Sequence, residues 1–140
     1  MSLKQLTVFV ENKQGALVSI TETLAAHNVN IRALSIADTT HFGILRIITE
    51  HTNQVEEVLK KNDLTVSITS VISVCINDKP GGLSSVLHVL ADNDIQIEYM
   101  YAFVSDSKKD DAYVVMRIED DLRAQEILKA HGFYGLEIDE

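Results

Sequence analysis

The sequence predicts an α+β protein made of two tandem ferredoxin-like βαββαβ units, each an antiparallel sheet with its helices on one face. Two observations lead to this prediction. Residues 12–31 align with residues 78–97 at a shift of 66, which reveals an internal repeat. The hydrophobic periodicity also changes in the same order in both copies, through strand, helix, two strands, helix and strand. The aligned identities are Lys13/Lys79, Gly15/Gly81, Leu17/Leu83, Ser19/Ser85, Leu24/Leu90, Ala25/Ala91 and Ile31/Ile97.

Each element of the first copy has its own signal. Strands are predicted from alternating or β-branched apolar runs, and helices from apolar residues three or four positions apart. The predicted elements are a strand at 6–10, a helix around 17–24, a hairpin with strands at 29–38 and 44–49 and a turn at 40–43, a second helix around 55–59, and a fourth strand at 64–68.

The repeat places the domain boundaries at 1–70 and 71–140. A single unit of this size buries little apolar surface, so packing two together gives a physical reason for the duplication. Apolar residues keep a period of two from Val66 to Ile76, and no Gly or Pro interrupts them. The last strand of the first copy is therefore predicted to continue directly into the first strand of the second.

Composition and charge exclude several classes of function. The net charge is −9, with 6 basic and 7 acidic residues in 1–70 and 6 basic and 14 acidic residues in 71–140. This field repels nucleic acid and anionic membrane surfaces, so neither is an expected partner. No apolar run is long enough to span a membrane, and the N-terminal sequence lacks signal-peptide features, which predicts a cytoplasmic protein.

The sequence contains no pattern that indicates catalysis, a cofactor or a metal. Cys75 is the single cysteine, no two histidines have a metal-ligand spacing, and no nucleophile elbow, phosphate loop or dinucleotide fingerprint is present. The carboxylates at 110–111 and 119–121 are interpreted as capping and solubilising residues. We therefore predict that the chain is not an enzyme.

Two equivalent loops, "ENKQGAL" and "NDKPGGL", follow the first strand of each copy and lead into a helix. Glycine there permits a positive φ and lets a ligand approach the backbone, and a helix N-terminus favours an anion. From the residues alone, a tight strand–helix turn and a ligand-binding loop both remain open.

These loops carry a resemblance to a known family. A strand, "NDKPGGL", a helix and then "NDIQI" resemble the ACT domain, a small amino-acid-sensing regulatory module, and "ENKQGAL" with "HNVNI" resembles a second copy. The whole chain is similar to small stand-alone proteins made of two ACT domains. The resemblance implies a free amino acid bound at the interface of two ACT units, between the loop of one and the start of the second strand of its neighbour.

The resemblance also implies the site residues. Asn12 and Asn30 stand where serine-sensing members carry asparagines, whereas the second copy has Asp78 and Gln96. Gln14 replaces the proline usual in the family. The aromatic residues of 99–103 are either sheet packing or an apolar wall for a ligand. The implied ligand-binding set is Asn12, Gln14, Gly15, Ala16, Leu17, Asn30, Arg32, Asp78, Pro80, Gly81, Gly82, Leu83 and Gln96.

The expected function is therefore that of a non-enzymatic regulatory protein that binds an amino acid. A homodimer is expected, together with an unidentified effector protein that receives the signal. The alternative is an interaction or dimerisation module that binds no small molecule.

Overall fold

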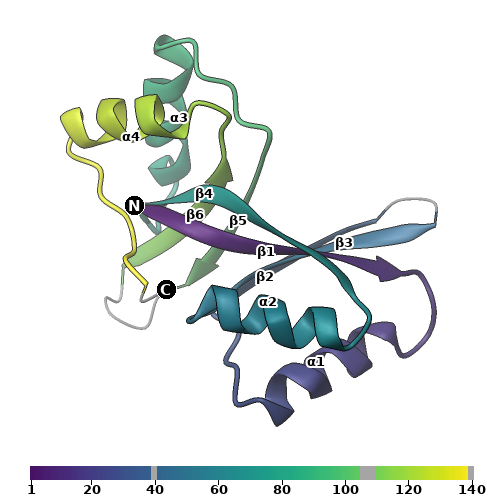
Figure 1. Ribbon diagram of the computed structural model, residues 1–140. Coiled ribbons are helices and arrows are strands. Elements are labelled where there is room, and N and C mark those ends of the chain that lie inside the picture. Colours follow the sequence, from purple (N-terminus) through teal and green to yellow (C-terminus); the bar gives the residue numbers. More distant parts are fainter. Residues whose placement is uncertain (39–40, 105–109, 139–140) are drawn as a thin grey trace. The chain divides into compact units, whose positions relative to one another are not determined.

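A computed structural model describes residues 1–38, 41–104 and 110–138, and within them the chain forms four helices and six strands (Figure 1). The predicted α+β class with tandem ferredoxin-like units is confirmed. The predicted turn at 40–43 lies partly outside the described residues. The elements are β1 (Ser2–Glu11), α1 (Ala16–Ala26), β2 (Ala33–Asp38), β3 (Phe42–Ile48), α2 (Thr52–Lys61), β4 (Thr65–Asn77), α3 (Gly82–Asp92), β5 (Tyr99–Val104), β6 (Asp111–Arg117) and α4 (Asp121–Ala130).

The chain packs as two compact units. The first-repeat unit contains Lys4–Thr69 with Ile138, and the second-repeat unit contains Met1–Leu3 with Ser70–Glu137. Strand β1 thus contributes its first residues to the second-repeat unit and the rest to the first-repeat unit. The boundaries 1–70 and 71–140 remain a prediction about the duplicated segments.

The first-repeat unit has the strand order β2-β3-β1-β4, and β3 pairs antiparallel with both β1 and β2. Helices α1 and α2 lie on one face of this sheet (Figure 1). The alternation predicted for residues 6–10 is confirmed, because Leu6, Val8 and Val10 are buried in the core and Thr7 and Phe9 are not. The core consists of Leu6, Val8, Val10, Ile20, Leu24, Leu45, Ile47, Val55, Leu59 and Val66.

The second-repeat unit has the strand order β4-β6-β5 with antiparallel pairing, and α3 and α4 pack with its sheet. The predicted fourth strand of this copy is not formed in residues 133–138, which have no assigned strand. The backbone amide of Cys75 still donates to the Tyr134 carbonyl at 2.7 Å, but that of Ser73 donates to Met1 at 2.8 Å. Met1, the residue just before β1, therefore takes a hydrogen-bonding position that the fourth strand would otherwise occupy.

Strand β4 is continuous over 13 residues, from Thr65 to Asn77, as predicted from its uninterrupted periodicity. It supplies the last strand of the first repeat and the first strand of the second. None of the helices in the described part of the chain is long and apolar enough to cross a membrane.

Candidate functional site

Both predicted loops are tight turns of the same kind. The amide of Gly82 donates to the Lys79 carbonyl at 3.0 Å, and the amide of Ala16 donates to the Lys13 carbonyl at 3.3 Å. Gly81 has φ 87° and ψ −9°, which matches the third position of a type II turn, where glycine is favoured. Gly15 has nearly the same conformation, with φ 86° and ψ −7°. Pro80 stands at the second position, the usual place for proline in such a turn.

The paired glycines of the second loop have different structural reasons. A Cβ at Gly15 or Gly81 would meet nothing within 4 Å, so their positive φ accounts for both glycines. A Cβ at Gly82 would lie 2.0 Å from the Asn77 carbonyl oxygen, so only glycine fits there. The turn alone therefore explains the Pro-Gly-Gly sequence.

The two helices that follow these turns begin without a side-chain cap. Helices α1 and α3 begin directly after Gly15 and Gly81, and neither start has a side-chain capping hydrogen bond. Helix α4 differs, because the Asp120 side chain accepts a hydrogen bond from the Arg123 amide. Ala16 and Gly82 donate within the turns, but the amides that follow them have no side-chain cap, and such a helix start is suited to an anion.

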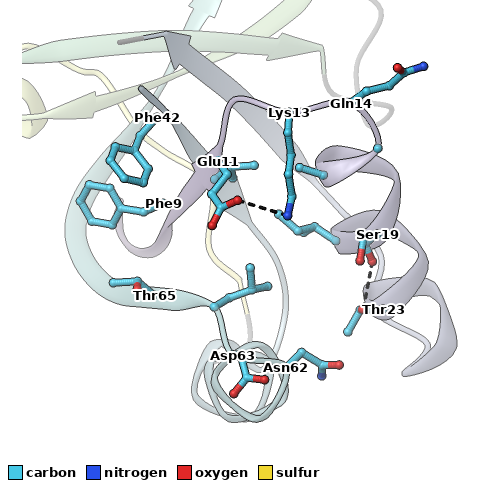
Figure 2. A pocket seen from close by; sticks show the side chains of 15 residues that line it. Phe9, Glu11, Lys13, Gln14, Ser19, Thr23, Phe42, Asn62, Asp63 and Thr65 are labelled. Carbon is cyan, nitrogen blue, oxygen red and sulfur yellow. Dashed lines mark hydrogen bonds and ion pairs between the residues drawn. The ribbon is translucent and has the colours of Figure 1, made fainter. Parts of the chain in front are cut away.

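A cavity of about 570 Å³ adjoins the first turn, and we call it the first-repeat pocket (Figure 2). It lies between the end of β1, the start of α1 and the turn after α2. Of the predicted residues, Gln14, Gly15 and Ala16 line it. Figure 2 shows Phe9 and Phe42 on one side, with Ser19 and Thr23 of α1 on the other.

The first-repeat pocket contains both charge signs. Lys13 Nζ lies 3.1 Å from Glu11 Oε2, and both side chains are largely exposed. Asp63 adds a carboxylate from the turn after α2. The sequence prediction missed this turn, because it lies far from Gly15 in the chain. The repeat offered a signal, since Asn62–Leu64 aligns with His131–Phe133 at a shift of 69.

The first-repeat unit does not bring Asn12 and Asn30 together. Asn12 Nδ2 donates to Asp38 Oδ1 at 2.9 Å, so Asn12 lies at the end of β2. Asn30 precedes the start of β2 and lines a separate cavity with His27, His51 and Gln54. At about 3.3 Å per residue, the six residues of β2 separate the two asparagines by roughly 20 Å.

Arg32 also lies at the start of β2, where its Nη1 is 3.2 Å from Glu50 Oε1. This finding favours a solvent-facing pair on an edge strand over a preformed carboxylate clamp. Both side chains are substantially exposed, so the pair contributes little to stability.

The second-repeat residues are placed in the same way. The Asp78 amide donates to the Asp110 carbonyl, and Gln96 is exposed before β5, at the far end of that strand from the turn. Leu83 packs against the core, whereas its counterpart Leu17 is exposed. The side chains of Phe103 and Tyr113 stack with ring centroids 5.6 Å apart, which assigns Phe103 to packing across the sheet.

Within the described residues, no group of three or more His, Cys, Asp or Glu side chains could hold a metal ion.

Comparisons with known proteins place these features in a family. Residues 1–134 match the family described as an ACT domain pair. No curated protein matches the chain. Among solved structures, protein BT0572 from Bacteroides thetaiotaomicron is 39% identical with a TM-score of 0.90, over 97% of this chain and 92% of that one.

Two more distant structures share the fold. The regulatory subunit of aspartate kinase from Thermus thermophilus is 11% identical with a TM-score of 0.65, over 91% of each chain. The corresponding subunit from Thermus flavus is 12% identical with a TM-score of 0.63, over 91% of this chain and 88% of that one. The match over nearly the whole chain confirms the resemblance inferred from the two glycine loops, and the chain belongs to the ACT domain pair family.

Proposed function

We propose that this chain is a non-enzymatic regulatory protein that binds a free amino acid between ACT units of two copies. The turn at Lys13–Ala16 of one copy forms one half of the site, and the residues before β2 of a second copy form the other. The observation that supports this proposal is the position of Asn12 and Asn30 at opposite ends of β2. Side chains separated in this way cannot contact one small ligand within one unit.

The chemistry of the two halves suits an amino acid. The uncapped start of α1 favours the ligand carboxylate, and the Asn12 amide can serve a carboxylate through its NH₂ or an ammonium through its oxygen. From the second copy, Asn30 offers another amide and Arg32 a guanidinium. Because the Arg32–Glu50 pair is exposed, exchanging Glu50 for a ligand carboxylate costs little.

The surface beside β2 supports association with a second copy. Strand β2 is an edge of its sheet, and Leu34 and Ile36 on it are 56% and 48% exposed. Leu17 of α1, 43% exposed, adjoins them across an apolar groove. Burial of exposed apolar side chains favours association. The first repeat is also nearly neutral, with a net charge of −1 against −8 for the second, so self-association meets less repulsion there.

Regulation in this proposal is a change in association. A ligand that binds both copies stabilises the assembly, and coupling of this kind is typically about 1–3 kcal/mol. The signal then passes to a separate effector protein.

Thermal unfolding of the full chain with each of the twenty amino acids tests the proposal. A ligand at 100 times its dissociation constant stabilises the folded state by about 2.7 kcal/mol, which raises the unfolding temperature. We expect such a shift with one amino acid or a small related group. The proposal is wrong if none of them, at about 10 mM, changes the unfolding temperature.

A dimerisation module without a small-molecule ligand is the alternative that the exposed apolar residues of β2 also favour. It predicts an association that depends on protein concentration and is unaffected by every amino acid. Sedimentation of the chain with and without each amino acid separates the two functions.

A further inference from the structure

The second-repeat unit contains a cavity of about 300 Å³ at the position equivalent to the first-repeat pocket, and we call it the second-repeat pocket. It lies between the end of β4, the start of α3 and the turn after α4. The fold forms an equivalent pocket in each repeat. Where the residues that line the two pockets differ, the fold does not require the difference. The aligned lining pairs are Phe9/Cys75, Val10/Ile76, Glu11/Asn77, Lys13/Lys79, Ala16/Gly82, Ser19/Ser85, Phe42/Asp111, Asp63/Gly132, Leu64/Phe133 and Thr65/Tyr134.

Polar residues replace both phenylalanines in the second-repeat pocket. Cys75 Sγ donates to Tyr134 Oη at 3.3 Å, and Tyr134 Oη donates to Asp111 Oδ2 at 3.3 Å. Cys75 is buried, so its thiol stands where an apolar side chain could pack and needs a hydrogen-bond partner. Since the first repeat folds with Phe9 and Phe42 there, this chain of polar groups is not needed for folding.

Cys75 and Tyr134 keep their protons at neutral pH, because both pKa values are raised. Burial is the main cause that raises the pKa of the Cys75 thiol, and the hydrogen bond with Cys75 is the main cause that raises the pKa of Tyr134. A protonated thiol is a poor nucleophile, which argues for binding rather than covalent chemistry. The Tyr134 proton is directed at Asp111 Oδ2, and a carboxylate has lone pairs enough on its second oxygen, Oδ1, to accept a further hydrogen bond.

A cation lies in the same cavity without an ion pair. In the first repeat, Glu11 pairs with Lys13 at 3.1 Å. Asn77 replaces that carboxylate in the second repeat, and Lys79 has no ion pair within the described part of the chain. The second-repeat pocket thus presents an ammonium from the turn and a carboxylate oxygen from β6, with Ile76 and Phe133 as apolar walls.

We propose that the second-repeat pocket binds a zwitterionic α-amino acid, with Lys79 on its carboxylate and Asp111 Oδ1 on its ammonium. This inference rests on the proposed function, because it takes the ligand class to be the same. It assigns a separate site within one repeat that needs no second copy. The ligand side chain lies against Phe133 and Ile76, and the cavity volume limits it to a small or medium size.

Amide chemical-shift mapping of the ¹⁵N-labelled full chain tests this site, with the twenty amino acids added one at a time. We expect saturable shifts at Lys79, Gly132 and Tyr134 with at least one of them. Lys79→Met and Asp111→Asn each remove a charge-assisted hydrogen bond and should weaken that binding about tenfold or more. Lys129→Met, an equal change of charge on an exposed part of α4, should leave the affinity within twofold.

Two outcomes of this shift mapping overturn the proposal, and they are distinguishable. Shifts confined to Gln14, Gly15 and the residues before β2 would contradict the second site and leave the proposed function intact. The absence of shifts anywhere with every amino acid would contradict both.

Small ions that carry only one of the two charges of an amino acid test whether the site requires a zwitterion. Acetate and methylammonium, each at the concentration that saturates the site with the amino acid, should produce no saturable shifts at Lys79 and Tyr134. Saturation by acetate alone would overturn the assignment in favour of a simple anion site.

Discussion

Adjacent glycines in the second glycine turn are required for different structural reasons, which the sequence alone does not distinguish. Gly81 needs a left-handed backbone, while its neighbour Gly82 needs space beside the Asn77 carbonyl. In the first repeat Ala16 takes the place of Gly82, so the close approach to that carbonyl is particular to the second turn.

Alanine at these two adjacent positions should therefore have unequal effects on the free energy of unfolding. Gly81→Ala strains only the backbone and should cost about 1–2 kcal/mol. Gly82→Ala introduces a clash with backbone and should cost roughly 3 kcal/mol. Urea unfolding of both variants measures the difference, with Gly15→Ala as the repeat-matched control for Gly81→Ala. Equal losses at Gly81 and Gly82 would contradict the structural account.

The sequence predicted the conformational role of Gly15 and Gly81 because φ preferences are local. It did not predict the hydrogen bonds among Cys75, Tyr134 and Asp111, or the Arg32–Glu50 pair. These residues are far apart in the chain, and only the sheet register and the helix positions bring them together. Their contacts are therefore a property of the fold rather than of any local pattern.

At the scale of elements, hydrophobic periodicity predicted most strands and helices because each has one buried face. It failed at the end of the second repeat, where Tyr134 to Ile138 form no strand. Gly135 packs so closely against Ser73 that a Cβ would lie 2.1 Å from the Ser73 carbonyl oxygen. The Ser73 hydroxyl also accepts a hydrogen bond from the Leu136 amide, replacing a regular backbone ladder. A single-sequence pattern contains no signal for this competition.

The start of α4 offers a test at the element scale. Asp120 accepts from the Arg123 amide at 3.3 Å, in line with the interpretation of residues 119–121 as capping residues. Asp120→Ala should lower the free energy of unfolding by about 1 kcal/mol. Glu119→Ala changes the net charge equally and should stay within about 0.5 kcal/mol of the parent, because Glu119 is exposed outside the helix. Denaturant unfolding compares the two, and similar losses would contradict a capping role.

At the scale of the whole molecule, duplication gives two related units with different surfaces. The first repeat is nearly neutral and has an exposed apolar edge, whereas the second carries most of the negative charge. The sequence identified the duplication and the family. It could not reveal that Asn12 and Asn30 lie at opposite ends of β2, because that separation depends on the pairing of β2 and β1 with β3.

The central claim, that one ligand is held by two copies, is tested most directly by mixing two binding-deficient variants. Asn12→Ala and Asn30→Ala chains should each fail to bind the amino acid identified by thermal unfolding. After the two are unfolded together and refolded at equal concentration, random pairing in a symmetric dimer restores about one quarter of the sites. Isothermal titration calorimetry should find this fraction with the affinity of the unaltered protein. A mixture that binds no more than either variant alone would contradict the account.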